Sequence, residues 1–277
     1  MRNSAVRAVR RGLLCALSCA ALSAALPAAA APQPKEAPRV PFAERYQAVQ
    51  RGGIVRAADT SATATNSSSA ELRVPEGSRV SYARLYSADV TDLVRSARSG
   101  LWTAAQVNAA MGRSAVGGWG GWTLVVAYEN AAEPMRRPAL WDGFETVGPR
   151  TGALRVGLTE TAVPKGSAGQ LGVVAHDGGR GTSGDYLAVQ TSRAKSVLLS
   201  DSANSADDVM NSSITDFGDT GRMERLPAHR NTLGYDSDVF DLGGALRHGA
   251  DRVHVRFGAR QDTVRLGALF LQADVRR

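Results

Sequence analysis

Acidic and amide side chains gather in two short stretches of the chain, and these residue types can bind a metal ion. The candidate ligands are Asp201, Asn204, Asp207, Asp236, Asp238 and Asp241. Calcium takes roughly six to eight oxygen ligands from carboxylates, amides and carbonyls. Carboxylates two residues apart in an extended loop point the same way and can share one ion. The pattern predicts a stabilising Ca²⁺ site. The alternative, in which these residues cap turns by bonding to their own backbone, stays open.

Tryptophans are the second group of residues with binding chemistry. Trp119 lies between two glycine pairs, in the sequence GGWGG, so little neighbouring bulk covers its ring. An exposed indole can stack on a sugar, and Trp119 is therefore a candidate ligand-binding residue for a glycan. Trp122 and Trp141 lie in the most apolar segments and are expected in the core.

A hydrolase is the third chemistry that the residue types allow. His176 and Ser183 are seven residues apart, and Asp185 follows closely. The G-x-S-x-G turn of many serine hydrolases is absent, and a triad is defined by spatial geometry rather than by spacing. The carboxylates weighed for a glycosidase are Asp142 with Glu129 or Glu145. A secreted hydrolase acting on polysaccharide or ester substrates is thus an alternative to a binding protein.

The elements that must position these residues are short strands. Apolar runs of strand length recur every 8–12 residues or so, with Gly, Pro, Asn or Asp between them. The expected strands include 122–128, 139–144, 153–158, 170–175, 186–190, 253–257 and 264–275. Asp92–Arg98 is expected as a short helix, and Thr60–Ala70 as a Ser/Thr/Ala loop. The spacing predicts an all-β chain folded as a single β-sandwich of jelly-roll type.

The N-terminus predicts an exported protein. Arginines precede an apolar run, Gly12–Leu26, and a row of alanines follows Pro27. This order is typical of a signal peptide, residues 1–30, and the apolar run is too short to span a bilayer. A Pro-rich tether, 31–41, and the β-sandwich domain, 42–277, follow. Sec export is expected, with the twin-arginine route as the alternative because Arg10 and Arg11 are adjacent.

Charge and cysteine content exclude several classes of protein. The formal net charge is +7, and both cysteines, Cys15 and Cys19, lie in the predicted signal peptide. The mature chain is therefore expected to have neither a disulfide framework nor a transmembrane segment. Its arginines are scattered rather than clustered, which predicts a solvated surface and no nucleic-acid partner.

A family resemblance spans most of residues 45 to 275. The segments that carry it are 66–78, 83–86, 89–94, 121–128, 141–144, 184–185, 199–201, 211–214 and 234–238. In their order and spacing they resemble the N-terminal head of large actinobacterial secreted and cell-surface proteins that carry conserved extracellular repeat modules. The resemblance implies an extracellular β-rich domain with an adhesive or structural role, and it implies no particular activity. Downstream repeats and a sorting motif are missing, so a stand-alone secreted protein is expected.

Together these observations predict a secreted, non-enzymatic β-sandwich protein with an adhesive, cell-envelope or matrix-associated role, stabilised by calcium. The expected partners are cell-wall or extracellular glycans, or other surface proteins. A carbohydrate-binding module and a secreted hydrolase are the alternatives.

Overall fold

The computed structural model describes residues 40–62, 67–85, 88–97, 99–105, 119–159 and 162–276. The predicted signal peptide lies outside these residues. The first strand begins at Val40, inside the range 31–41 expected as a tether. In this part of the chain, no helix is long and apolar enough to cross a membrane.

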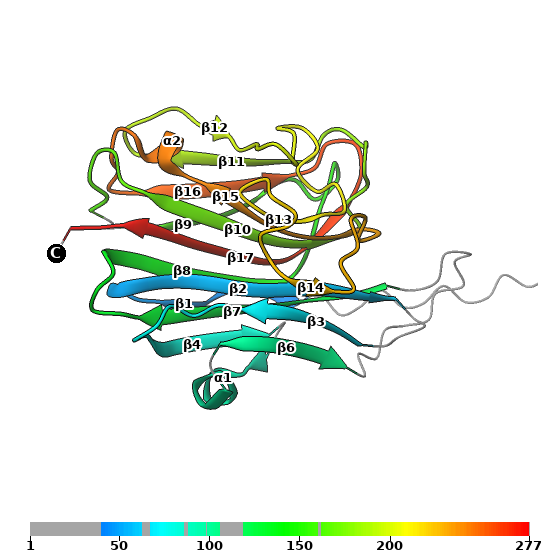
Figure 1. Ribbon diagram of the computed structural model, residues 1–277. Helices are drawn as coiled ribbons and strands as arrows, with labels where there is room; N and C mark the ends of the chain where they lie inside the picture. Colours follow the sequence, from blue (N-terminus) through cyan, green and yellow to red (C-terminus); the bar gives the residue numbers. More distant parts are fainter. Residues whose placement is uncertain are drawn as a thin grey trace, which may run out of the picture. The chain divides into compact units, whose positions relative to one another are not determined.

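Strands dominate the structure, which confirms the predicted all-β, sandwich-like fold (Figure 1). The longer strands are β1 (Val40–Gln47), β2 (Gln50–Ala62), β3 (Ser67–Leu72), β4 (Arg79–Leu85), β6 (Gly100–Ala105), β7 (Trp119–Glu129), β8 (Met135–Val147), β9 (Leu154–Leu158), β10 (Gly169–His176), β11 (Tyr186–Thr191), β15 (Tyr235–Asp241), β16 (Val253–Gly258) and β17 (Val264–Asp274). The short elements are β5 (Ala88–Asp89), β12 (Val197–Leu198), β13 (Ile214–Asp216), β14 (Arg225–Leu226) and the helices α1 (Thr91–Ala97) and α2 (Gly243–Leu246).

One large sheet folds back on itself. Its strand order is β13-β15-β10-β17-β8-β2-β7-β4-β5, and β1 also pairs with β8. At the fold, β2 pairs with β8 only at Gln50–Arg136 and Arg51–Met135. Beyond these two pairs β2 continues beside β7, and its inner side contacts the half of the sheet that contains β17 and β10. Ile54 donates its backbone N–H to Gln272 Oε1 at 2.6 Å and accepts from Gln170 Nε2 at 3.0 Å.

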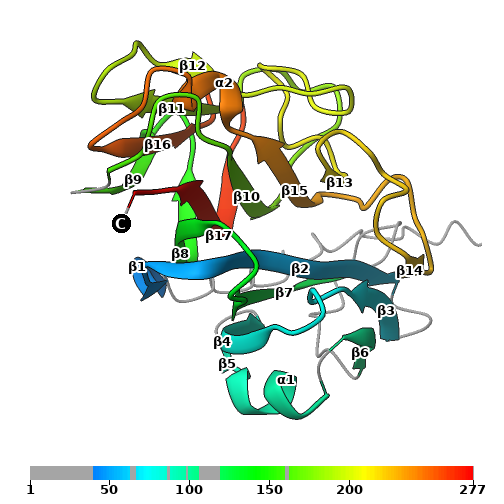
Figure 2. The same cartoon turned by 60° about the vertical axis from the view of Figure 1, so that its left-hand side comes forward.

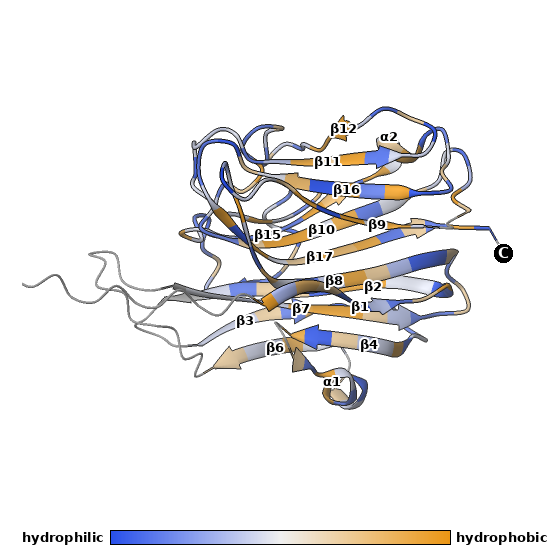
Figure 3. Cartoon of the chain, turned by 180° about the vertical axis from the view of Figure 1, so that it is seen from behind, coloured by the Kyte–Doolittle hydropathy of each residue, from blue (hydrophilic) through white to orange (hydrophobic). Residues whose placement is uncertain are grey.

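Two smaller sheets cover the outer faces of the folded sheet. The sheet β12-β11-β16-β9 lies over β10, β15 and β17, and the sheet β14-β3-β6 lies over β2 and β7. Figure 2 shows these layers in descending order as β11 with β16, then β10 with β15, then β2, then β3 with β6. Along β16, buried and exposed residues alternate, and blue and orange segments alternate accordingly in Figure 3.

Within the described ranges, four hydrophobic cores fill the spaces between the layers, and the smallest of them contains Ala58, Val174, Ile214 and Tyr235. The largest includes Trp141 and Phe257 and lies under β11 and β16. The second includes Trp122 and lies under β3 and α1. The third lies inside the fold of the large sheet, where Val125 and Phe270 approach from opposite halves. Trp122 and Trp141 are therefore core residues, as predicted, and 122–128 is buried throughout.

The predicted helix is present, and two expected loops are not. Asp89 Oδ1 accepts the backbone N–H of Thr91 at 2.9 Å, so α1 begins at Thr91 with a side-chain cap. The expectation of a loop at Thr60–Ala70 is wrong at both ends, because β2 runs to Ala62 and β3 begins at Ser67. The D-x-D-x-x-D segment is a central strand, β15, rather than an extended loop. Both errors concern strands that contain buried polar residues: Ser68 and Ser69 in β3, and Asp236 and Asp238 in β15.

Candidate functional site

A long connection between β12 and β15 builds a polar network over the end of the large sheet. Asp201 Oδ1 accepts the backbone N–H groups of Ala203 and Asn204, each at 2.9 Å, and this turn places Asn204 inward. Asn204 is fully buried. Its Nδ2 donates to Thr215 Oγ1 at 3.1 Å, and its Oδ1 accepts from Ser213 Oγ at 3.2 Å. Asn204 thus ties the connection to β13.

Asp236 and Asp238 lie beneath this network on one face of β15. Both are fully buried, and both contact Ser213: Asp236 Oδ1 accepts its backbone N–H at 3.0 Å, and Asp238 Oδ1 accepts its hydroxyl at 3.2 Å. The second oxygen of each carboxyl has no hydrogen-bond partner among the described residues. Burial raises the pKa of both, that of Asp238 to about 7, and the nearby Asp238 raises the pKa of Asp236 further. Asp236 and Asp238 therefore point to the same side of β15, as the sequence predicts for carboxylates two residues apart.

Asp185 is a third buried carboxyl in this region. Its Oδ1 accepts the backbone N–H groups of Val209 at 2.6 Å and Met210 at 2.9 Å. Its Oδ2 has no hydrogen-bond partner in the part of the chain that the structure describes. Burial raises the pKa of Asp185 to about 7. Asp185 therefore anchors the connection between β12 and β15.

The structure shows what surrounds each residue that was considered for a serine hydrolase. The His176 ring lies edge-on to Phe144 and Tyr235, with centroids 5.8 and 5.2 Å away. Burial lowers the pKa of His176 to about 4. Ser183 is exposed, and Asp185 is held by backbone amides as described above. These contacts give no support to the hydrolase hypothesis, which stays a prediction.

The carboxylates weighed for a glycosidase also have structural contacts. Asp142 is buried on β8, and its two oxygens accept hydrogen bonds from Arg45 of β1 and Arg84 of β4. Glu129 pairs with the exposed Arg79 at 2.7 Å. Asp142 therefore joins three strands, and a glycosidase role for this residue stays a prediction.

A cavity of about 360 Å³ lies beside the polar network. We call it the loop pocket, and its lining residues are Arg180, Ala203, Asp208, Asn211, Ser213, Thr220 and Arg230. Its size falls within the usual range for small-ligand sites, roughly 300–1,000 Å³. Ser213 connects its wall directly to Asp238 through the 3.2 Å hydrogen bond. The loop pocket thus lies next to the buried Asp238, but none of the six predicted ligands is part of its lining.

Two buried oxygens that belong to residues of the loop-pocket lining have no hydrogen-bond partner among the described residues. They are Asp208 Oδ1 and Asn211 Oδ1. Asn211 Nδ2 donates both of its hydrogens, to Ala203 O at 2.8 Å and to Asn204 Oδ1 at 3.1 Å, and this fixes the orientation of the amide. The other oxygen of Asp208 accepts the backbone N–H of Gly181 at 2.9 Å. Leaving buried acceptors unbonded costs free energy, so a donor-rich ligand would gain by pairing with them.

Two arginines supply donors to the same cavity. Arg180 and Arg230 are exposed residues of its lining. Arg180 Nη2 donates to the carbonyl oxygens of Ser212 at 3.4 Å and Arg230 at 3.2 Å, so the two residues are held side by side. The loop pocket therefore combines a carboxyl and an amide group with two cationic donors in its lining, and all of these groups can hydrogen-bond to the hydroxyl groups of a ligand.

The remaining predicted ligands lie around the network in different settings. Asp207 is exposed and accepts from Ser205 Oγ at 2.9 Å, and Asp241 is exposed and accepts the backbone N–H of Gly243 at 2.9 Å. The Asp241 contact is a turn-capping bond to the backbone, of the kind that the alternative interpretation expected, whereas the Asp207 contact joins two side chains. Trp119 is the first residue of β7, and its side chain lies outside what the structure describes.

Within the described residues, no three His, Cys, Asp or Glu side chains are grouped so as to hold a metal ion. The calcium site therefore stays a prediction. It requires a higher melting midpoint in millimolar calcium than in EDTA, because an ion bound only to the folded state stabilises that state by mass action. Equal midpoints would contradict it.

None of the six ligands predicted from the sequence lines the loop pocket, although Asp208 of its lining follows the predicted Asp207, and its basic side was missed as well. Arg180 and Arg230 are fifty residues apart in the chain and come from two separate turns. A basic residue within the Gly-rich turn 177–185 was the only available signal. Nothing in their spacing brings the two arginines together.

The fold and the site define a protein with a β-sandwich-like fold and a polar cavity formed by loops at the end of a folded sheet. Comparison with protein-family models, curated proteins and solved structures gives no match. The resemblance to actinobacterial surface-protein heads accordingly stays a prediction.

Proposed function

We propose that this chain is an exported, non-catalytic β-sandwich that binds a hydroxyl-rich glycan of the cell envelope or extracellular matrix in the loop pocket. The observation that carries the proposal is the pair of buried, unbonded acceptors, Asp208 Oδ1 and Asn211 Oδ1, in a cavity that also exposes Arg180 and Arg230. An adhesive role follows if the bound glycan is part of a polymer or a cell surface.

The chemistry of a sugar matches this arrangement. Each hydroxyl group both donates and accepts a hydrogen bond, so vicinal hydroxyls can donate to Asp208 and Asn211 while they accept from Arg180 or Arg230. The network behind the pocket holds these acceptors in place before binding. Asn211 donates twice within it, and Asp208 is fixed by Gly181. Such preorganisation reduces the entropy lost on binding.

Affinity electrophoresis of residues 31–277 in gels containing neutral soluble polysaccharides (dextran, galactan, mannan) tests the proposal. We expect at least one polysaccharide to retard the wild-type protein. Arg230→Ala and Asp208→Asn should each weaken that retardation by about tenfold, because a hydrogen bond to a charged group contributes about 1.5–3 kcal/mol.

Arg193→Ala is the matched control. Arg193 is an exposed arginine paired with Asp251 at 3.1 Å and does not line the loop pocket. Its loss should change neither the stability nor the retardation measured relative to a gel without polysaccharide, because exposed ion pairs contribute little and Arg193 lies outside the loop pocket. Retardation by none of the polysaccharides, or equal retardation of all variants, would contradict the proposed function.

A further inference from the structure

Arg56 is a buried cation inside the fold of the large sheet. It lies on β2, and its side chain is only 3% exposed. Its Nη2 donates to the carbonyl oxygen of Thr215 at 2.6 Å and to Asp216 Oδ1 at 3.0 Å. Both acceptors belong to β13, so Arg56 connects the two halves of the folded sheet.

The rest of this guanidinium lacks acceptors. Arg56 Nε and Nη1 are buried and have no hydrogen-bond partner among the described residues. A guanidinium carries five N–H groups, and Nη2 accounts for two of them, so three donors of a buried cation stay unpaired. Burying charged donors in this way is costly unless another group completes their hydrogen bonds.

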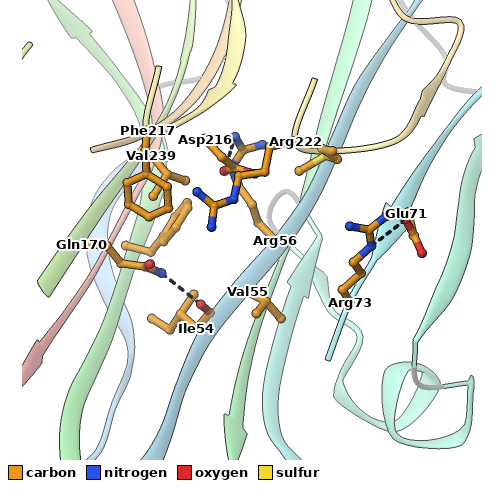
Figure 4. Close-up of a pocket in the computed structure, with 12 residues that line it drawn as sticks. Ile54, Val55, Arg56, Glu71, Arg73, Gln170, Asp216, Phe217, Arg222 and Val239 are labelled. Carbon is orange, nitrogen blue, oxygen red and sulfur yellow. Dashed lines mark hydrogen bonds and ion pairs between the residues drawn. The ribbon is translucent and has the colours of Figure 1, made fainter. Parts of the chain in front are cut away.

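A second cavity of about 360 Å³ adjoins Arg56, and we call it the arginine pocket. Figure 4 shows the Arg56 guanidinium among the lining residues, beside Asp216 and Arg222. Part of the lining is apolar and comes from the third core: Ile54, Val239 and Phe270. The arginine pocket therefore places unpaired cationic donors next to an apolar wall.

The charges of the arginine pocket favour an anion. Arg222 lies 5.0 Å from the centroid of the Phe217 ring, and both residues line the cavity. Arg73, also in the lining, is paired with Glu71. The charged lining residues are thus Arg56, Arg73 and Arg222 against Glu71 and Asp216. The excess of one positive charge matches a monoanion better than a dianion.

We propose that the arginine pocket binds a carboxylate carried on a compact apolar body, with Arg56 Nε and Nη1 as its buried donors and Arg222 as its outer cation. The apolar body would lie against Ile54, Val239 and Phe270. This site shares no residue with the loop pocket and does not rest on the proposed glycan binding. It adds a small-molecule or terminal-acid site to a protein whose other pocket suits neutral hydroxyl groups.

Titration with sodium butyrate tests this site, with butyramide and inorganic phosphate as matched probes. The readouts are calorimetry and the arginine Nε–Hε signals in NMR spectra of residues 31–277. We expect butyrate to bind and to shift the Arg56 signal downfield, because its Nε–H gains a charged acceptor. Butyramide and phosphate should bind at least tenfold more weakly.

Two variants locate the binding. Arg222→Ala, at an exposed position, should weaken butyrate about tenfold while the protein stays folded. Arg56→Gln should abolish binding, and Arg193→Ala should leave it unchanged. If Arg56→Gln does not fold, Arg222→Ala and the Arg56 signal decide alone. Absent butyrate binding, equal binding of butyramide or phosphate, or unchanged affinity in Arg222→Ala would each overturn the proposal.

Discussion

Lowering the pH from 8 to 5 in EDTA should stabilise the protein, with a gain in unfolding free energy on the order of 3 kcal/mol. Burial raises the pKa of Asp185 and Asp238 to about 7 and that of Asp59 to about 6, and it raises the pKa of Asp236 as well. In the unfolded chain these carboxyls titrate near pH 4. The folded protein therefore binds more protons across this range, and acid favours it.

His176 changes the unfolding free energy in the opposite direction. Burial lowers the pKa of His176 to about 4. Between about pH 6.5 and 4, His176 is therefore protonated in the unfolded chain and neutral in the folded chain. This loss offsets the gain from roughly one carboxyl, and the remaining carboxyls determine the sign. Urea unfolding at both pH values measures the difference directly.

The variant Asp185→Asn measures how much of this pH dependence of stability comes from Asp185. An asparagine Oδ1 can still accept the amides of Val209 and Met210, while the charge is removed. We expect this variant to be more stable than wild type at pH 8 and to depend less on pH. A wild-type protein that loses stability between pH 8 and 5 would show instead that these carboxylates are ionised in the folded state, as a bound cation would require.

The predictable part of the fold consists of strands that border apolar cores. The segment 122–128 is buried on both faces, and Val253–Phe257 alternates between core and solvent, so both carry a pattern that sequence alone reveals. The unpredicted strands, β2 and β15, carry buried charged residues. Arg56 of β2 points into the fold of the large sheet, and Asp238 of β15 points away from it, toward the polar network. Charged residues at buried positions hide a central strand.

Distance along the chain explains what was and was not predicted of the two pockets. Asp201 and Asn204 are close in sequence, and their turn could be read from the chain. The partners that complete each pocket arrive from distant segments. Arg56 meets Asp216 across a separation of 160 residues, and such a pairing depends on how the large sheet folds back.

Replacing Gly172 by alanine should destabilise the protein by about 3 kcal/mol, roughly a 10 °C fall in the melting midpoint. Gly172 of β10 pairs with Phe270 of β17, and the Phe270 ring lies over the glycine so closely that a methyl group there would overlap it. Phe270 is 1% exposed and packs in the third core, so moving its ring disturbs that packing. Displacing it opens the third core, which joins the two halves of the folded sheet.

A double-mutant cycle with Phe270→Leu tests the cause of this loss. Leucine removes the overlapping ring, so Gly172→Ala should cost less in that background than in wild type. Gly244→Ala is the control, because nothing lies within 4 Å of a Cβ at this position of α2 and alanine favours a helix. A cost below about 1 kcal/mol for Gly172→Ala, or additive effects in the cycle, would mean that the ring is not held against β10 and that the folded sheet is joined by its polar contacts instead.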